Sequence, residues 1–472
     1  MLRKSIWVLA LCALALLSVS CGKKQPDKAP DKEQGKEQGT ENEACEHMIM
    51  IDAAVEASCT EPGKSEGRHC LTCGEVLTQA QEIPAKGHTW QNGVCTVCGA
   101  VNETQGLLFT EMDGYCVLSG MGDGKNGAVI VPAEHNGLPV TAVAEGAFTG
   151  CEALYSLILP EGITEIGAFA FENCTNLKSV TLPESLREIQ EGAFLRCSSL
   201  QKIALPEGIT AIRSAAFCDC KGLTEVILPQ TLQSIEDTAF SGCSRMKGFD
   251  IPAGVTQIGW DAFSFCEAME SFTVPEGVTM IADALFRGCK KLKTVNIHDG
   301  VTQIGNSAFA QCSALKTVII PESVRGIDRF AFQKCTSLSE IVLPEGITAV
   351  VYQLFDGCIG LKKVVLPESV TCIDEYAFRG CVALCEIKIP KNVTLIGGYA
   401  FQNCKALTEI VIPEKVAKID LYAFDGCAKM ENIYCGVSAQ PEKWWPTWNF
   451  NCPATVHWGG SWEYVDGVPT LQ

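Results

Sequence analysis

Hydrophobic positions recur with a fixed spacing along most of the chain. Phenylalanine occupies every twenty-third position over a long stretch, and a cysteine follows three positions later each time. The phenylalanines are Phe148, Phe171, Phe194, Phe217, Phe240, Phe263, Phe286, Phe309, Phe332, Phe355, Phe378, Phe401 and Phe424. A fixed period in the twenties predicts a solenoid, because one unit cannot bury its own apolar face but a stack of units can.

Each repeat also predicts a short strand. Leu177, Val180 and Leu182 form an L-x-x-V-x-L pattern, which fits the inward face of a strand. Pro183 ends this strand, because proline cannot donate a hydrogen bond to a neighbouring strand. At about 4.8 Å per coil, a stack of thirteen such units would extend for roughly 60 Å.

The thirteen cysteines of the repeat, from Cys151 to Cys427, allow two interpretations. They could bind metal or carry electrons. Alternatively, each is a small buried hydrophobic residue whose weak S–H donor meets a turn carbonyl. One cysteine per coil gives each thiol only stacked copies of itself as neighbours. We therefore favour the structural interpretation and expect most of these thiols to be free.

The repeat pattern points to a known family. Residues 159–181 read LPEGITEIGAFAFENCTNLKSVT, which generalises to L-P-E-x-I-T-x-I-x-x-x-A-F-x-x-C-x-x-L-x-x-V-x. This pattern resembles the BspA-like class of leucine-rich repeats in bacterial surface proteins, over residues 105–458. The resemblance implies a mainly β fold, a right-handed solenoid of about 13 coils that is capped at both ends.

The caps are expected on either side of the array, which covers residues 143–433. In the first cap, residues 105–142, an Asp113-Gly114 turn between alternating apolar residues predicts a β-hairpin. The second cap, residues 434–472, holds five tryptophans: Trp444, Trp445, Trp448, Trp458 and Trp462. We expect them to close the last coil, since an open solenoid must cover its last apolar layer. Sugar stacking is the alternative, and Cys435 and Cys452 could form a disulfide in this cap.

The outward positions of the predicted strands form the default binding surface. The members that we assign to this binding strip are Ile158, Thr181, Ile227, Thr273, Asn296, Ile319, Val342, Val365, Val411 and Tyr434. Threonine, isoleucine and valine favour strands in any case. A continuous stripe of exposed β-branched residues on a concave sheet also suits an extended protein ligand.

The amino terminus has the pattern of an exported protein. In residues 1–20, Arg3 and Lys4 precede an apolar run that is typical of a secretory signal peptide and too short to span a membrane. Cys21 follows small residues and resembles the lipobox cysteine of bacterial lipoproteins, which implies that its thiol is lipidated. Residues 21–44 would then combine this lipid anchor with a polar tether that cannot bury apolar area.

Residues 45–100 hold six cysteines and three of the chain's six histidines. Cys70 and Cys73, and Cys95 and Cys98, form two C-x-x-C-G segments whose four thiolates fit one tetrahedral zinc ion. Disulfide bonds and redox chemistry are the alternatives. We favour a structural zinc site whose ligands all come from the protein.

The second half of this module also resembles a known type of segment. Residues 83–99, IPAKGHTWQNGVCTVCG, resemble zinc-ribbon-like repeats of bacterial surface proteins, which pair a histidine with a following C-x-x-C. The resemblance implies that His88 joins the second cysteine pair and His47 the first. Cys45 and Cys59 would be shared between the two halves, and the spacing leaves the allocation open.

Charge and motif content exclude several functions. The chain has 37 basic and 55 acidic residues, a net charge of −18, which becomes −20 once residues 1–20 are removed. This balance argues against a nucleic-acid partner, since phosphate binding needs clustered lysine and arginine. The repeats contain a single histidine, His298, and the chain has no phosphate-binding loop, dinucleotide fingerprint or H-E-x-x-H motif. We therefore expect no enzyme.

The resemblance to BspA-like proteins implies a lipid-anchored protein of the cell surface. Such a protein would contact host matrix proteins, host cells or other bacteria by multivalent contact along the strip. Two alternatives stay open. The chain could be a structural scaffold of the envelope, or it could bind metal at the surface through residues 45–100.

Overall fold

The computed structural model describes residues 20–21, 45–46, 48–87, 90–91, 94–95, 97–98, 106–122, 127–465 and 468–472. The chain divides into two compact units, residues 1–100 and 101–472. The described residues are in strands, turns and loops, and they include no helix long and apolar enough to cross a membrane.

The first unit consists of short strands. They are β1 (Ser20–Cys21), β2 (Cys45–Glu46), β3 (Ile49–Asp52), β4 (Gly63–Lys64), β5 (Gly67–Cys70), β6 (Val76–Thr78), β7 (Glu82–Ile83), β8 (Trp90–Gln91) and β9 (Val94–Cys95). Strands β3, β5 and β6 form an antiparallel sheet, and β4 pairs with β7. Most of the described side chains of this unit, within residues 48–87 and 97–98, are exposed, with a small buried set that includes Ile49, Ala57 and Cys70.

The second unit begins with the predicted hairpin. Strands β10 (Leu107–Glu111) and β11 (Cys116–Met121) are antiparallel, and Gly114 in the turn between them has a left-handed φ of 86°. Strand β11 then pairs in parallel with β14 (Leu138–Val143), which also pairs with β13 (Glu134–His135). The hairpin therefore covers the open edge of the first coil.

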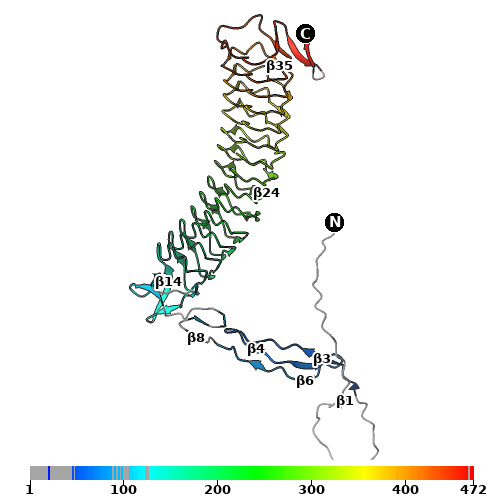
Figure 1. Cartoon of the computed structure of the whole chain (residues 1–472). Coiled ribbons are helices and arrows are strands. Elements are labelled where there is room, and N and C mark those ends of the chain that lie inside the picture. Colours follow the sequence, from blue (N-terminus) through cyan, green and yellow to red (C-terminus); the bar gives the residue numbers. More distant parts are fainter. Residues whose placement is uncertain are drawn as a thin grey trace, which may run out of the picture. The chain divides into compact units, whose positions relative to one another are not determined.

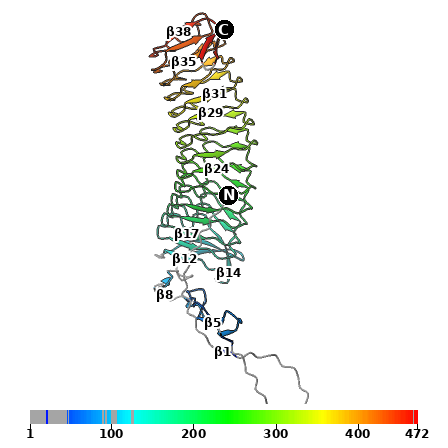
Figure 2. The same cartoon turned by 90° about the vertical axis from the view of Figure 1, so that its right-hand side faces the viewer.

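The first side of the solenoid is a parallel ladder of strands, here called the main ladder (Figure 2). Its strands are β12 (Ala128–Ile130), β15 (Ser156–Ile158), β17 (Ser179–Thr181), β19 (Lys202–Ala204), β21 (Glu225–Ile227), β24 (Ser271–Thr273), β26 (Thr294–Asn296), β29 (Glu340–Val342), β31 (Lys363–Val365), β33 (Glu386–Ile387), β35 (Glu409–Ile412), β37 (Asn432–Cys435) and β38 (Thr455–Trp458). Residues twenty-three positions apart lie directly opposite each other, as in the pair Leu157 and Val180.

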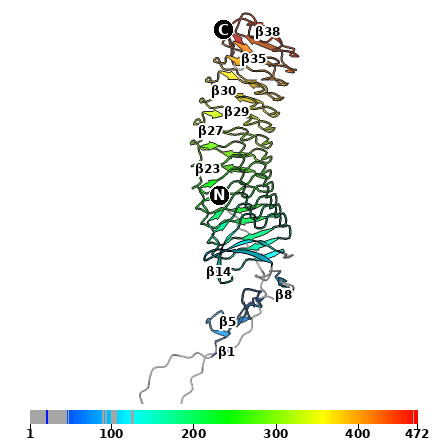
Figure 3. The same cartoon turned by 90° about the vertical axis from the view of Figure 1, so that its left-hand side faces the viewer.

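A second parallel ladder, which the repeat pattern did not predict as strands, follows each proline turn (Figure 3). It runs through β14 and then β16 (Glu165–Ile166), β18 (Glu188–Ile189), β20 (Ala211–Ile212), β22 (Ser234–Ile235), β23 (Gln257–Ile258), β25 (Met280–Ile281), β27 (Gln303–Ile304), β28 (Gly326–Ile327), β30 (Ala349–Val350), β32 (Cys372–Ile373), β34 (Leu395–Ile396) and β36 (Lys418–Ile419). The second residue of each strand is buried, which accounts for the isoleucine or valine at that position.

The phenylalanine turns close each coil on the side between the two ladders. The Phe171 ring stacks on Phe194 with centroids 5.1 Å apart, and its N–H donates to the carbonyl of Ala193 in the next coil at 2.8 Å. Similar ring contacts run from Phe148 to Phe424, and all of these rings are buried. The turn is therefore the third surface along which successive coils are joined.

This turn uses two left-handed residues in every coil. The residue two places before each repeat phenylalanine and the residue two places after it have positive φ, for example Phe169 at 54° and Asn173 at 57°. A left-handed residue other than glycine costs roughly 1–2 kcal/mol. Hydrogen bonds to the next coil offset this cost, since the N–H of Phe169 donates to Glu191 and that of Asn173 to Leu195.

The cysteine ladder has the predicted structural role. From Cys174 to Cys427, each thiol is buried and donates to the carbonyl oxygen of the phenylalanine in the preceding coil, at 3.0–3.3 Å. These cysteines are free, and burial raises the pKa of the Cys289 thiol to about 12. Each thiol therefore remains a protonated donor at neutral pH.

Two extra phenylalanines interrupt the regular stack. Phe249 and Phe272 stand at the middle position of the main strand, where the other coils have valine, isoleucine or leucine. Their rings contact the repeat rings, and the spacing from Phe263 to Phe286 widens to 6.3 Å. Within the described residues 127–465, no main-ladder strand is assigned at 248–250. Residues 317–319 likewise lack an assigned main-ladder strand, so the distinctive feature of this point is the wide ring spacing.

The carboxyl end holds one more coil than the repeat pattern predicted. Strand β38 pairs with β37 in the same register, Thr455 opposite Asn432, so the ladder continues past Tyr434. Trp448 packs edge-on against Phe424 at 5.8 Å and is buried together with Trp444, while Trp445 and Trp458 are exposed. Two of the five tryptophans therefore close the last apolar layer.

The predicted fold class is confirmed, with two corrections. The chain is a mainly β solenoid with a 23-residue period, but it has about 15 turns rather than about 13, because β12 and β38 each add a coil (Figure 1). The disulfide considered for the second cap is absent, since Cys435 and Cys452 are both free.

The structural role of the ladder thiols can be tested with one buried cysteine. Replacement of Cys289 by alanine removes its hydrogen bond to Phe263 and leaves a small cavity, so we expect the free energy of unfolding to fall by about 1–2 kcal/mol in urea denaturation. The matched control is Cys385→Ala, at an exposed cysteine outside the ladder, with an expected change within about 0.5 kcal/mol. Equal effects of the two substitutions would contradict the assignment.

Candidate functional site

The binding strip lies on the outward face of the main ladder, and most of it is exposed; Ile319 occupies the equivalent position in a coil whose residues 317–319 form no assigned strand. Eight of its ten members have exposed side chains: Ile158, Thr181, Ile227, Thr273, Asn296, Ile319, Val342 and Val365. Ile319 is 83% exposed and Val342 is 58% exposed, although both are large aliphatic residues. The inward neighbours of these residues are core positions, so the alternation of the strand fixes which side chains face outward.

Polar and charged residues beside the strip are paired along the stack. Lys202 and Glu225 form an ion pair at 2.6 Å, and Lys363 and Glu386 form another at 3.0 Å, each joining two successive coils. Within the strip, the Asn296 amide donates to the hydroxyl of Thr273 at 3.2 Å. These two pairs of charges beside the strip thus compensate each other locally, and the aliphatic members of the strip remain available for contact.

The prediction that the strip is exposed is wrong for its last two members. Val411 is only 6% exposed and Tyr434 is half-buried. Both lie under the C-terminal hairpin, formed by the antiparallel strands β39 (Trp462–Val465) and β40 (Val468–Leu471). The Trp462 ring contacts the Tyr434 ring with centroids 4.5 Å apart, and the N–H of Val411 donates to the Tyr464 hydroxyl at 3.3 Å.

The sequence contained a signal for this hairpin that the repeat analysis did not use. Residues 462–471 read WEYVDGVPTL, an Asp466-Gly467 pair between alternating residues, which is a hairpin signal. Its position on the strip carries no local signal, because it depends on contacts with residues far away in the sequence. The strip could therefore be predicted only up to Val365.

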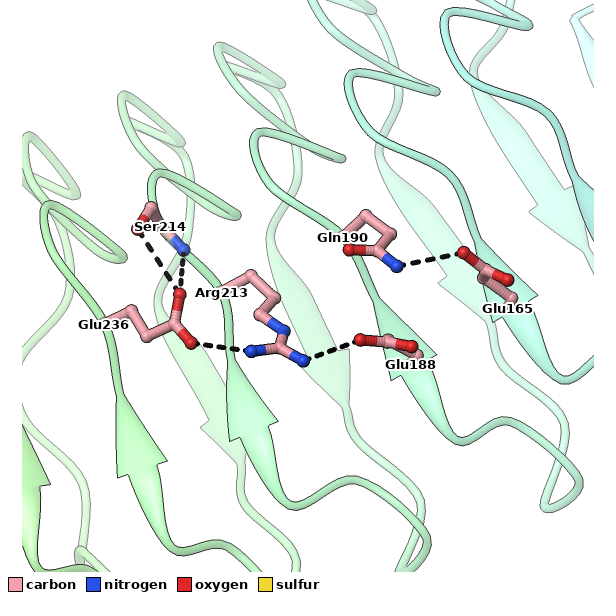
Figure 4. Close-up of polar contacts among 6 residues, drawn as sticks. All are labelled: Glu165, Glu188, Gln190, Arg213, Ser214 and Glu236. Carbon is pink, nitrogen blue, oxygen red and sulfur yellow. Dashed lines mark hydrogen bonds and ion pairs between the residues drawn. The ribbon is translucent and has the colours of Figure 1, made fainter.

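A polar network occupies the edge of the second ladder (Figure 4). The guanidinium of Arg213 reaches Glu188 in the coil before it at 2.7 Å and Glu236 in the coil after it at 2.9 Å. These hydrogen bonds raise the pKa of Arg213 above its ordinary value. Glu236 also accepts from the N–H of Ser214 at 3.1 Å. The network joins three coils, and its partly exposed charged groups are paired with one another.

A second network surrounds a buried carboxylate. Asp356 is 4% exposed and accepts two hydrogen bonds from Arg379, at 2.7 and 2.9 Å. The amides of Gln333 and Gln353 also donate to it, at 3.1 and 2.9 Å. The Arg379 guanidinium lies over the Tyr376 ring at 4.5 Å. Four hydrogen bonds from neighbouring side chains thus reach the buried carboxylate of Asp356, so this cluster is a structural joint.

In the Cys/His module, residues 45–100, the structure describes the turn of the first of the two C-x-x-C-G segments. Cys70 ends β5, Cys73 lies in the turn that follows, and Gly74 has a left-handed φ of 74° with its N–H donating to the Cys70 carbonyl at 2.9 Å. This is the tight turn expected of a C-x-x-C-G segment. Cys59 and Cys70 are buried, whereas Cys73 and Cys98 are exposed.

Several other predicted site residues lie where the structure does not describe their side chains. His47 and His88 lie outside the described residues, as do the side chains of Cys21, Cys45 and Cys95. Among the residues that are described, no group of three or more histidine, cysteine, aspartate and glutamate side chains is arranged to hold a metal ion.

The fold, the period and the two-ladder coil define a leucine-rich-repeat solenoid. A family model described as "BspA type Leucine rich repeat region" matches residues 141–270, 257–385 and 348–440. The matched segments together span 141–440, and the chain belongs to this family. No curated protein matches the chain.

Several solved structures are similar to this chain. A leucine-rich repeat protein from Bacteroides ovatus is 26% identical, with coverage of 75% of this chain and 98% of that one and a TM-score of 0.54. A leucine rich cell surface protein from Faecalibacterium prausnitzii is also 26% identical, with coverage of 71% and 94% and a TM-score of 0.46. The pneumococcal vaccine antigen PcpA is 21% identical, with coverage of 71% and 87% and a TM-score of 0.47.

The two arginine networks should differ strongly in their effect on stability. Arg379→Ala leaves the buried Asp356 without its cation, so we expect a loss of about 3–5 kcal/mol in the free energy of unfolding. Arg213→Ala breaks ion pairs between partly exposed groups, and we expect a loss below about 1 kcal/mol. Urea denaturation of both variants measures the difference. A loss for Arg379→Ala as small as that for Arg213→Ala would show that the Asp356 cluster is not a joint.

Proposed function

We propose that this protein is exported, anchored to a membrane by a lipid on Cys21, and binds protein partners through the exposed strip of the main ladder. The observation that carries the proposal is the row of exposed aliphatic side chains, with Ile319, Val342 and Val365 on consecutive coils. Monomeric proteins rarely expose such a contiguous apolar row without a partner.

The anchor and the tether support a location at the cell surface. The signal-peptide pattern of residues 1–20 directs export, and a lipid on Cys21 would hold the mature chain at a membrane. A polar coil of 23 residues between Cys21 and the first module reaches about 25–30 Å. This length would keep the solenoid clear of the lipid headgroups.

The repeated surface favours binding over catalysis. The family is a repeat architecture that is generally not enzymatic, and the polar clusters at Arg213 and Asp356 are used between coils. A stack of coils presents many similar contact sites at fixed spacing, which raises the affinity for an extended partner by multivalency. Host matrix proteins and the surface proteins of host or bacterial cells have this extended, repeated character.

The strip can be tested in the mature chain with Cys21→Ser, which cannot be lipidated. We expect it to bind at least one protein in a panel of immobilised extracellular-matrix proteins. The double substitution Ile319→Lys and Val342→Lys should weaken that binding by about tenfold or more, because two apolar contacts become charged. Surface plasmon resonance measures the change.

The matched control is Met280→Lys on the second ladder, an equally large apolar residue that is 51% exposed. It should leave binding unchanged. Binding that is lost equally in both variants would exclude the strip as the contact surface. If the folded protein binds nothing in the panel and crosslinking in intact cells recovers only envelope proteins, the scaffold alternative replaces adhesion.

We also propose one structural zinc ion in residues 45–100. The support is the donor set, six cysteines and three histidines in a short segment, together with the tight turn at Cys70–Gly74. Cys70, Cys73, Cys95 and Cys98 would supply the four thiolate ligands of one tetrahedral site. His88 and His47 would each take a ligand place beside one cysteine pair in the alternative allocation. When bound, the metal would hold this small module folded, because few of the module's described side chains are buried.

Metal removal tests this site. Protein purified under metal-replete, reducing conditions should contain about one zinc per chain by elemental analysis. Cys73→Ser should lower that content, whereas Cys385→Ser on the solenoid should not. Strong chelation should unfold only the module and leave the solenoid transition unchanged. A mass lower by two hydrogens per cysteine pair, without zinc, would establish the disulfide alternative instead.

A further inference from the structure

The C-terminal hairpin covers coils that are otherwise built like the exposed ones. Val411 stands at the same position of the coil as Val342 and Val365, yet it is the one that is buried. Tyr434 likewise stands at the same position of its coil as Thr181 does in an earlier coil. Figure 1 shows the two hairpin strands beside the last coils of the solenoid. The covered coils therefore carry strip surface that is already occupied.

Three contacts hold the hairpin on the strip, and each uses a different interaction. Glu463 forms an ion pair with Lys391, the Tyr464 hydroxyl accepts from the N–H of Val411, and the Trp462 ring packs on Tyr434. Lys391 and Lys388 together lower the pKa of Glu463, with the hydrogen bond from Lys391 as the largest cause. An acidic residue between two aromatic residues is thus matched to a strip that offers lysine, backbone N–H and an aromatic ring.

The hairpin is joined to the solenoid by a short glycine segment. Gly459 and Gly460 have left-handed φ values of 81° and 108°, and they connect β38 to the hairpin. The φ of 108° at Gly460 is a conformation that residues with a side chain rarely adopt, so this place favours glycine. Two consecutive glycines give the backbone wide freedom to rotate, which is what a hinge between two folded parts needs.

The packing under the hairpin is incomplete. Hollows of about 430 Å³ open on both sides of Tyr464, one lined by Lys391, Val411 and Trp462, the other by Val365 and Lys388. A two-stranded hairpin is marginally stable by itself in water, so its order depends on these few contacts. Its docked state is therefore separable from the fold of the solenoid, which is held by the coil-to-coil contacts.

From these observations we infer that the C-terminal hairpin is a displaceable strap. It occupies in cis the place on the last coils where a protein partner docks an extended segment with an acidic residue next to an aromatic residue. Displacement exposes Val411 and Tyr434 and lengthens the free strip beyond Val365. This inference rests on the proposed binding role of the strip and names both its regulation and the chemistry of its partner.

Hydrogen exchange on the mature Cys21→Ser chain tests whether the strap opens by itself. The amides of β39 and β40 and the amide of Val411 should exchange on the order of a hundredfold faster than those of Ile410 and Ile433 in the adjacent core, because strap opening leaves the coils intact. Exchange of the strap only in the same global step as the core would overturn the inference.

Charge reversal tests the ion pair that holds the strap. Glu463→Lys should speed exchange of the strap amides by a few-fold, and the double variant Lys391→Glu with Glu463→Lys should restore the slower rate. The matched control is Lys202→Glu, which breaks the equivalent ion pair with Glu225 beside the strip, many coils before the strap. Equal acceleration in the control would overturn the assigned contact.

A peptide with the sequence of residues 459–472 tests the partner chemistry. It should bind the opened variant Trp462→Ala with Tyr464→Ala about tenfold more tightly than it binds the unchanged chain, whose strap competes for the site. A peptide with lysine in place of the glutamate should lose this binding, and so should the opened variant with Lys391→Glu. Equal binding of the peptide to both chains would overturn the inference. This outcome does not depend on the matrix panel, because hydrogen exchange and peptide binding are both measured without it.

Discussion

Each repeat phenylalanine is joined to the coils on both sides of it. Its ring stacks on the next ring, its N–H donates to the next coil, and its carbonyl accepts the thiol of the cysteine in that coil. The same carbonyl also accepts the N–H of the cysteine in its own coil, as Phe171 does from Cys174. Because these groups repeat with one period, a change in the length of a regular coil would displace them from their partners in the adjacent coils. This contact fixes the 23-residue spacing and, through it, the register of both ladders.

The sequence predicted those parts of the fold in which each coil repeats its neighbour. The phenylalanine and cysteine positions, the inward strand residues and the buried thiol donors all follow from the period. The ends could not be predicted in this way. Strand β12 begins 28 residues before β15 rather than 23, and Trp448 stands 24 residues after Phe424, so neither matches the pattern although both complete coils. The second ladder was missed because two-residue strands leave almost no alternation to detect.

The strip is a further consequence of this stacking. A side chain such as Val342 is exposed because the strand alternates and because the proline turn leaves nothing to cover it. The sequence therefore predicted the exposure of the strip residues wherever the alternation of the strand alone determines it. It failed at Val411 and Tyr434, where a segment from another part of the chain lies on the sheet. In the Cys/His module, the C-x-x-C-G turn at Cys70 follows the local pattern.

The wide spacing at Phe249 and Phe272 bears on how the solenoid folds. Cooperativity in a stacked protein depends on the coupling between adjacent units, and the repeat rings are most widely separated here, at 5.9 and 6.3 Å. The stacking of the phenylalanine rings therefore contributes least to the coupling of the coils around Phe263. A folded segment that grows coil by coil gains the least from ring stacking when it crosses this point.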